Sequence, residues 1–116
     1  MFLLCYNINR VIYMSKIVDA VIGHAIGDAM GVPTEFCIRE KLLKNPVTEM
    51  IGYGSHPVPE GSWSDDTSMS IGFLDAVIND NGEINLTDIM MNFYYWLKED
   101  KFTPQGEVFD AGRTWR

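Results

Sequence analysis

Apolar side chains recur at helical spacing, one, three and four residues apart, in three segments of the chain. Ser15 is placed to cap the first segment, and the run Asn-Asp-Asn-Gly at 79–82 stops the second. The predicted helices cover Ser15 to Met30, Ser64 to Asn79, and Asn85 or Thr87 to about Lys98, with a short helical turn over residues 39–43. No segment shows the sustained alternation of a half-buried strand, so the sequence predicts an all-α fold.

A stripe of glycines follows the first predicted helix. Gly23, Gly27 and Gly31 are four residues apart and therefore share one face. Because each glycine costs a helix ~1 kcal/mol relative to alanine, the stripe indicates close approach of another helix or of a ligand. Asp28 lies beside the stripe in the last turn before Pro33 ends the helix, where a negative charge opposes the helix dipole. We therefore expect Asp28 to face a positive or hydrogen-bond-donating partner.

The balance of charges narrows the classes of partner. The chain of 116 residues carries 9 Lys and Arg against 16 Asp and Glu, a net charge of −7, and its 47% of hydrophobic residues is typical of one globular domain. This acidity argues against a nucleic-acid partner, which needs clustered basic side chains, and suits a protein that gathers cations. No apolar run approaches the ~20 residues of a membrane span, so no membrane association is expected. Cys5 and Cys37 form no disulfide framework, which indicates a reduced, cytoplasmic setting.

The residues before Ser15 do not resemble a signal peptide. Their apolar stretch ends at Tyr6, and they have neither a basic leading region nor a small-residue cleavage site. Met14, just before the predicted helix, is a more natural start. Residues 1–14 are therefore expected to be a disordered extension or the product of an upstream start.

The segment 63–67, Trp-Ser-Asp-Asp-Thr, joins a Gly/Pro-rich loop to the second predicted helix. Neighbouring carboxylates diverge by ~100° inside a helix, but at a helix start the first has non-helical dihedrals, so Asp65 and Asp66 can point at one centre. Such oxygen ligands suit Mg²⁺, Mn²⁺ or Ca²⁺. Taken alone, the motif is explained better by ordinary capping of the helix by Ser64 and the two acids. A Ca²⁺-binding module is the weakest alternative, because the regularly spaced acidic calcium loop is absent.

Polar residues elsewhere add further candidates. Glu35 lies two residues past Pro33, so its carboxylate serves either as a mobile acid or base or as an ordinary solvated group. His24 lies one turn before Asp28 and is placed either to hydrogen-bond with it or to face solvent. His56 lies in the Gly/Pro-rich loop, where it either touches a substrate or, as the default, is exposed to solvent. The glycines of that loop serve either to make turns or to bring backbone N–H groups near a diphosphate.

Three motifs follow one another along the chain: GDAMGVPTE at 27–35, GSWSDDT at 61–67 and FDAG at 109–112. In their order and spacing they resemble the ADP-ribosylglycohydrolase family, and the resemblance extends from about residue 17 to residue 116. The element WSDDT after a Gly/Pro-rich loop is the most specific of the three.

The resemblance implies an orthogonal multi-helix, all-α domain that cleaves the glycosidic bond between ADP-ribose and a protein side chain or a related small molecule. It also implies a two-metal Mg²⁺ or Mn²⁺ centre at the bottom of a cleft. By position in the motifs, the implied metal ligands are Ser64, Asp65 and Asp66, the implied catalytic residues are Glu35 and Asp66, and the implied substrate-binding residues are Asp28, Asp110 and Gly112.

The second set of metal ligands in that family, a D-x-D-S/T motif, has no counterpart after Asp66. Residues 15–116 are therefore expected to form the N-terminal portion of such a domain, incomplete, with half of the metal ligands supplied from outside this chain. The alternative is a non-catalytic remnant or partner subunit of the same fold. Both cases predict exposed apolar helix faces that a second chain could cover.

Overall fold

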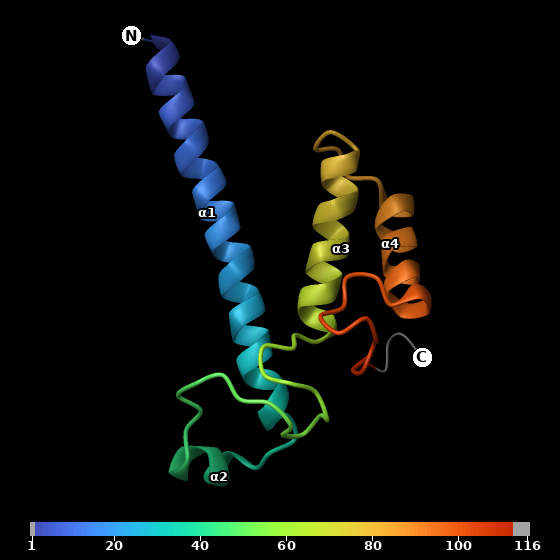
Figure 1. Ribbon diagram of the computed structural model, residues 1–116. Helices are drawn as coiled ribbons and strands as arrows, with labels where there is room; N and C mark the ends of the chain where they lie inside the picture. The colour runs from blue at the N-terminus through green and yellow to red at the C-terminus, as the bar shows by residue number, and fades with distance from the viewer. Residues whose placement is uncertain (1, 113–116) are drawn as a thin grey trace.

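The described part of the chain is built from four helices (Figure 1). The computed structural model describes the backbone of residues 2–112 and the side chains of residues 16–112. The helices are α1 (Phe2–Gly31), α2 (Arg39–Lys44), α3 (Asp65–Asn79) and α4 (Leu86–Glu99), with one 3-10 turn, Val32–Thr34, after α1. These residues contain no strand, which confirms the all-α prediction. Among the described helices, none combines the length and the apolar character that a bilayer crossing requires.

The first helix is longer than the sequence predicted. It begins at Phe2, so the predicted start and N-cap at Ser15 are wrong. No proline or glycine precedes Ser15, and nothing in that segment therefore stops the helix from continuing toward the N-terminus. The backbone of residues 2–14 continues the helix, and the interpretation of this segment as an extension or the product of an upstream start stays a prediction. At its other end α1 stops at Gly31, as Pro33 predicted.

α3 and α4 form an antiparallel hairpin whose ends follow the sequence prediction (Figure 1). The Ser64 hydroxyl caps α3 by accepting a hydrogen bond from the Asp66 N–H at 3.4 Å. Gly82, with φ of 95°, follows α3 in a backbone region that favours glycine. The Asn85 side chain caps α4 by accepting from the Thr87 N–H at 3.0 Å. Both helices are confirmed close to their predicted bounds because these signals are local.

The main apolar core belongs to the α3–α4 hairpin. Trp96 of α4 is only 1% exposed, and Ala76 of α3 and Ile89 of α4 are also buried. Asn92 of α4 donates a hydrogen bond from Nδ2 to the Gly72 carbonyl oxygen of α3 at 2.9 Å. The hairpin is therefore held by both apolar burial and a side-chain bond to the backbone.

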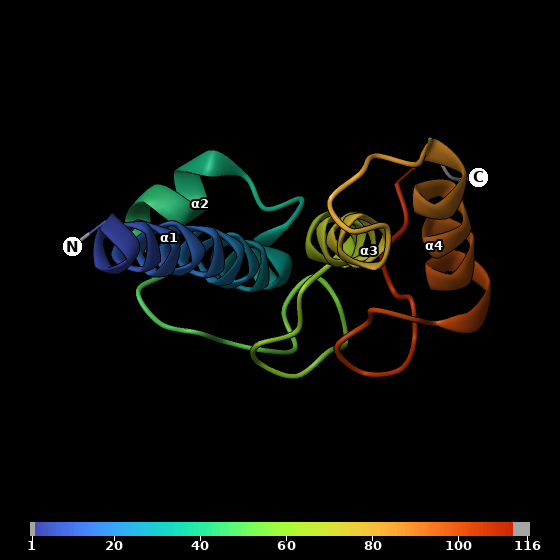
Figure 2. The same cartoon turned by 90° about the horizontal axis from the view of Figure 1, so that it is seen from above.

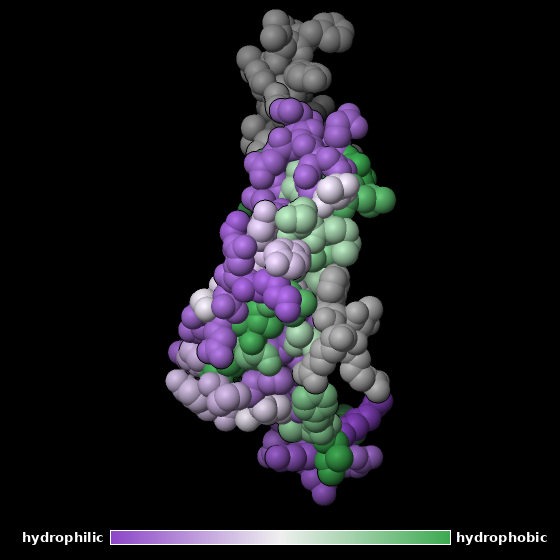
Figure 3. Space-filling view, turned by 90° about the vertical axis from the view of Figure 1, so that its right-hand side faces the viewer, coloured by the Kyte–Doolittle hydropathy of each residue, from purple (hydrophilic) through white to green (hydrophobic). Residues whose placement is uncertain are grey.

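α1 extends away from the hairpin as a long rod, as the view from above also shows (Figure 2). The described chain measures 56 × 33 × 21 Å with a radius of gyration of 17.4 Å, whereas a compact domain of this length has ~13 Å. α1 leaves four aliphatic side chains at least 46% exposed: Ile17, Val18, Ile22 and Ile26. Further apolar patches lie among polar side chains on the face that carries α4 (Figure 3). The expected exposed apolar faces are thus confirmed, and a second chain that covers them stays a prediction.

The Gly/Pro-rich loop, residues 52–62, packs against the 3-10 turn that follows α1. Gly54 lies directly on the Pro33 backbone, where an added Cβ would overlap the Pro33 carbonyl group. An added Cβ at Gly52 would likewise overlap the backbone, at the Glu60 nitrogen. Close backbone packing therefore explains these two glycines, and contact of the loop with a diphosphate stays a prediction.

The packing of this loop gives a first testable prediction. Gly54→Ala is expected to lower the free energy of unfolding by about 2–3 kcal/mol, because the added methyl group forces the loop away from Pro33. Gly23→Ala is the matched control, since its Cβ meets nothing within 4 Å and the helix gains about 0.5–1 kcal/mol. Urea unfolding followed by circular dichroism measures both variants. Similar effects of the two substitutions would contradict the packing described here.

Candidate active site

Asp28 joins α1 to the start of α3 through four hydrogen bonds. Its Oδ2 accepts from the backbone N–H groups of Ser64 and Thr67, each at 3.0 Å. The side-chain hydroxyls donate to the same carboxylate, from Ser64 Oγ at 2.7 Å and from Thr67 Oγ1 at 2.6 Å. The donor partner expected for Asp28 is therefore present, because the N–H groups at a helix start carry partial positive charge. Asp28 thus has a structural role, and its contact with a substrate stays a prediction.

The side chains around this junction are polar and deeply buried. Each of the four is at most 5% exposed: Ser62, Ser64, Thr67 and Ser68. The Ser68 hydroxyl donates to the Ser64 carbonyl oxygen at 2.9 Å, and Gln105 Nε2 donates to Ser62 Oγ at 3.0 Å. Because buried hydroxyls are stable only when hydrogen-bonded, this network holds the start of α3 in one position. Such rigidity is what a binding site requires of its support.

The side chains of Asp65 and Asp66, at the start of α3, face different parts of the molecule. Asp65 Oδ2 accepts a hydrogen bond from the Gly112 N–H at 3.1 Å, which brings the third sequence motif to the first turn of α3. Asp66 lines an open cavity of about 480 Å³, which Asp28 and Glu35 also line. Three of the predicted site residues therefore share one cavity, while Asp65 faces the segment that contains Gly112.

Negative charge is concentrated around Asp66. Desolvation raises the pKa of its carboxyl group, and repulsion from Asp65, Asp28 and Asp110 raises this pKa further. His24 acts in the opposite direction and lowers it. A cation placed among these carboxylates would relieve their repulsion, so the local field favours a positively charged ligand.

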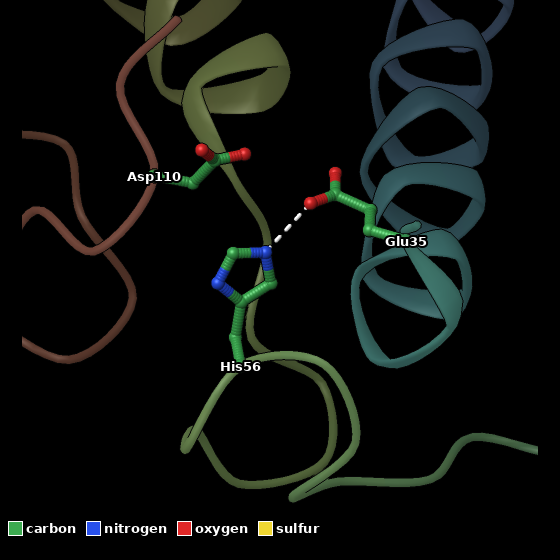
Figure 4. Close-up of side chains that lie close together, drawn as sticks. All are labelled: Glu35, His56 and Asp110. Carbon is green, nitrogen blue, oxygen red and sulfur yellow. Dashed lines mark hydrogen bonds and ion pairs between the residues drawn. The ribbon is translucent and has the colours of Figure 1, made fainter. Parts of the chain in front are cut away.

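Glu35, His56 and Asp110 form a second cluster (Figure 4). His56 Nε2 lies 2.6 Å from Glu35 Oε2, and one ligand atom of each of the three residues lies within 4.8 Å of the others. The His56 side chain is only 14% exposed, so the expectation that it faces solvent is wrong. Sequence reasoning missed this pair because the two residues lie in loops 21 positions apart, with no periodicity to connect them.

His24 has different partners from the one that its spacing suggested. Its Nε2 lies 3.2 Å from the backbone oxygen of Asp66 and 3.2 Å from Ser70 Oγ. These contacts replace the expected bond to Asp28, because the Asp28 carboxylate faces the donors of α3 instead. The other expectation for His24, exposure on the helix surface, is confirmed.

The glycine stripe of α1 borders the cavity that Asp66 lines. Gly23, Gly27 and Gly31 all contribute to its wall. A Cβ built on any of them would meet nothing within 4 Å, so no helix of the described chain packs on the stripe. Both explanations offered for the stripe, approach of a ligand and approach of a helix from outside the described residues, stay predictions.

Two groups of side chains have the donor chemistry to hold a divalent cation. The first is the predicted set: Ser64, Asp65 and Asp66. Ser64 Oγ gives its proton to Asp28, so a lone pair of this oxygen is available to a cation. The second is the cluster of Glu35, His56 and Asp110. The donors of the first group are all oxygens, which Mg²⁺ and Mn²⁺ prefer, but Asp65 faces Gly112 whereas Asp66 lines the cavity, so the predicted common centre of the two carboxylates stays a prediction.

The fold and the site together define an all-α protein with an acidic, tightly hydrogen-bonded helix start beside an open cavity. The sequence model of the ADP-ribosylglycohydrolase family matches residues 9–116. This chain therefore belongs to the ADP-ribosylglycohydrolase family, as its motifs indicated.

Two curated relatives are similar over most of the chain. One is the ADP-ribosylarginine hydrolase Tri1 of Serratia proteamaculans (strain 568), with 34% identity over 103 residues, 89% of this chain and 27% of that protein. The other is the ADP-ribosylarginine hydrolase Tri1 of Pseudomonas putida (strain GB-1), with 31% identity over 97 residues, 84% of this chain and 25% of that protein. The chain thus spans about a quarter of the length of these relatives. No solved structure matches it.

Proposed function

We propose that this chain takes part in hydrolysis of the glycosidic bond between ADP-ribose and a protein side chain or a related small molecule, with Mg²⁺ or Mn²⁺. The observation that carries the proposal is that Asp28, Glu35 and Asp66, from two separate motifs, line one cavity of about 480 Å³. A cavity of several hundred Å³ suits a small-molecule ligand. Membership of the family and the names of the two relatives support hydrolysis of an ADP-ribosyl bond.

Ser64, Asp65 and Asp66 would hold the cation in this proposal. Their oxygen donors fit Mg²⁺ or Mn²⁺, and the repulsion that raises the pKa of Asp66 is the repulsion that a cation would relieve. A bound cation of this kind supplies Lewis-acid polarisation and orients the hydroxyls of the ribose.

Glu35 and Asp66 are the proposed acid and base. Both line the same cavity, one from the loop after α1 and the other from the start of α3. A carboxylate within reach of a water molecule accepts its proton, and carboxylates beside the anomeric carbon stabilise the positive charge that develops as the bond breaks. Asp28, Asp110 and Gly112 are the proposed substrate contacts around them.

An ADP-ribosylated arginine is the first substrate to test, because both relatives are named ADP-ribosylarginine hydrolases. The acidic surroundings of Asp66 would repel the phosphates of a nucleic acid, so neither a nucleic acid nor a membrane is proposed as a partner. A cytoplasmic location is proposed as well, supported by the free thiol of Cys37.

The proposal is tested by incubating a longer form of this chain, which includes the region expected to supply the remaining metal ligands, with an ADP-ribosylarginine protein and millimolar Mn²⁺. We expect release of ADP-ribose that EDTA abolishes and that Asp66→Asn slows at least ~100-fold. Glu83→Gln removes one charge from an exposed position between α3 and α4, and serves as the matched control. Absence of release by this longer unsubstituted form, or equal release by its Asp66 variant, would contradict the proposal.

A second candidate is a non-catalytic subunit of the same fold that associates with another chain. The exposed aliphatic side chains of α1, such as Ile17 and Ile22, favour it. Light scattering would then show association or dependence on concentration. A monomer that releases ADP-ribose, and whose unfolding temperature does not change with concentration, would exclude this candidate.

A further inference from the structure

We propose that His56 is a positioning residue, which holds the Glu35 carboxylate beside Asp110 and toward the cavity that Asp66 lines. This inference rests on the proposed function, in which Glu35 acts as an acid or base. It adds to that function a residue outside the predicted site. His56 is not proposed to touch the substrate, so its effect on the reaction would pass entirely through Glu35.

The contact between His56 and Glu35 is a direct hydrogen bond. Nε2 lies 2.6 Å from Oε2, and because a carboxylate only accepts, the imidazole N–H is the donor. Two ligands of one cation, each bound at about 2.1 Å and near a right angle, would stand about 3 Å apart. The shorter separation therefore favours a hydrogen bond between the two side chains over a shared metal ion.

The His56 ring is mostly buried and lies against Phe109, so it can restrain a more exposed partner. Its centroid lies 6.1 Å from that of Phe36 and 5.3 Å from that of Phe109. The His56 side chain is 14% exposed, whereas the Glu35 side chain is 31% exposed. The better-packed histidine therefore restrains the carboxylate, rather than the reverse.

The neighbouring residue reinforces this connection through the backbone. The Ser55 hydroxyl donates to the Glu35 carbonyl oxygen, and the Ser55 N–H donates to the Pro33 carbonyl oxygen at 3.0 Å. The Gly/Pro-rich loop thus holds the Glu35 segment at its backbone through Ser55 and at its side chain through His56. Glu35 lies on a loop, but this second loop determines where its carboxylate points.

Asp110 explains why a donor is needed at this place. The Glu35 and Asp110 carboxylates both lie close to the His56 ring, with ligand atoms within 4.8 Å of one another, and like charges at such distances repel (Figure 4). Without the imidazole donor, the Glu35 carboxylate would be better hydrated if it turned away from Asp110. Loss of His56 is therefore expected to misplace Glu35 without unfolding its loop.

The experiment compares two substitutions of His56 in the ADP-ribose release assay. His56→Phe keeps an aromatic ring against Phe36 and Phe109 but removes the donor, and we expect kcat to fall ~10- to 100-fold with KM nearly unchanged. His56→Gln places an amide N–H at a similar reach, and kcat is expected to stay within ~3-fold of the unchanged chain. In a Glu35→Gln background, His56→Phe should lower kcat by less than a further ~3-fold, since each substitution alone already removes the positioned Glu35 carboxylate. A normal kcat in His56→Phe, or effects that multiply, would overturn the proposal.

A spectroscopic measurement tests the pairing independently of activity. Glu35→Gln is expected to shift the imidazole ¹⁵N resonances of His56, because it replaces a charged acceptor by a neutral one. Glu40→Gln, at an exposed position in α2, should leave them unchanged. Unchanged His56 resonances in Glu35→Gln would overturn the pairing. If the longer unsubstituted form releases no ADP-ribose, the proposed function fails, and this spectrum still decides the pairing.

Discussion

Replacing Asp28 by alanine is expected to lower the free energy of unfolding by about 3–5 kcal/mol. The substitution removes the shared acceptor of four hydrogen bonds from Ser64 and Thr67. Thr67 is 1% exposed and Ser64 is 5% exposed, so water cannot easily replace the lost partner. Because domains are commonly stable by only ~5–15 kcal/mol, this loss is expected to leave the start of α3 poorly attached to α1.

Urea unfolding followed by circular dichroism measures this effect. Asp28→Asn retains one oxygen acceptor and is expected to have an intermediate stability. Glu83→Ala, which removes an exposed carboxylate, is the control and should change stability by less than ~0.5 kcal/mol. A loss below about 1 kcal/mol in Asp28→Ala would show that the junction does not depend on this carboxylate.

Asp66→Asn is expected to remove most of the stability that Mn²⁺ gives to the chain. At a hundred times its dissociation constant, a ligand that binds only the folded state adds about 2.7 kcal/mol. If the substitution weakens binding ~100-fold, the same Mn²⁺ concentration adds only about 0.4 kcal/mol. Thermal unfolding with and without Mn²⁺ measures the difference. An equal rise of the unfolding temperature in both chains would place the cation elsewhere.

The same carboxyl group determines how these effects depend on pH. Desolvation and then Asp65 raise the pKa of Asp66, so the folded chain binds this proton more tightly than the unfolded chain does. Without a cation, the proton on Asp66 stabilises the folded chain at low pH. This contribution to the free energy of unfolding is lost as the pH rises through the raised pKa. Asp66→Asn should therefore unfold at a slightly higher temperature at pH 7. Mn²⁺ affinity should begin to fall, as the pH is lowered, at a higher pH than for an ordinary aspartate.

The fold could be predicted as far as its signals were local. The caps at Ser64 and Asn85 and the stop at Gly82 each act within a few residues, so α3 and α4 were predicted closely. The start of α1 was predicted wrongly, because Ser15 is only a favourable cap and no residue before it breaks a helix. The packing of Gly54 on Pro33 was not predictable either, since both turns and ligand contacts use glycine.

The site could be predicted where the sequence held an unfavourable feature that needed compensation. A carboxylate in the last turn of α1 required donors, and Asp28 has them, although the sequence could not show that they come from Ser64 and Thr67. Neither His56 nor Glu35 stands at an unfavourable position in the sequence, so nothing there predicted that the two side chains pair. A histidine in a loop is ordinary, and only the fold of two loops against each other brings the pair together.

In the proposed function, the acidic start of α3 binds a divalent cation. Titration calorimetry with Mn²⁺ on the longer form that includes the remaining metal ligands is the decisive measurement. We predict a saturable heat that disappears when Asp65 and Asp66 are both replaced by asparagine and that persists in His56→Gln. No heat at millimolar Mn²⁺, or the same heat from the doubly substituted chain, would contradict the claim.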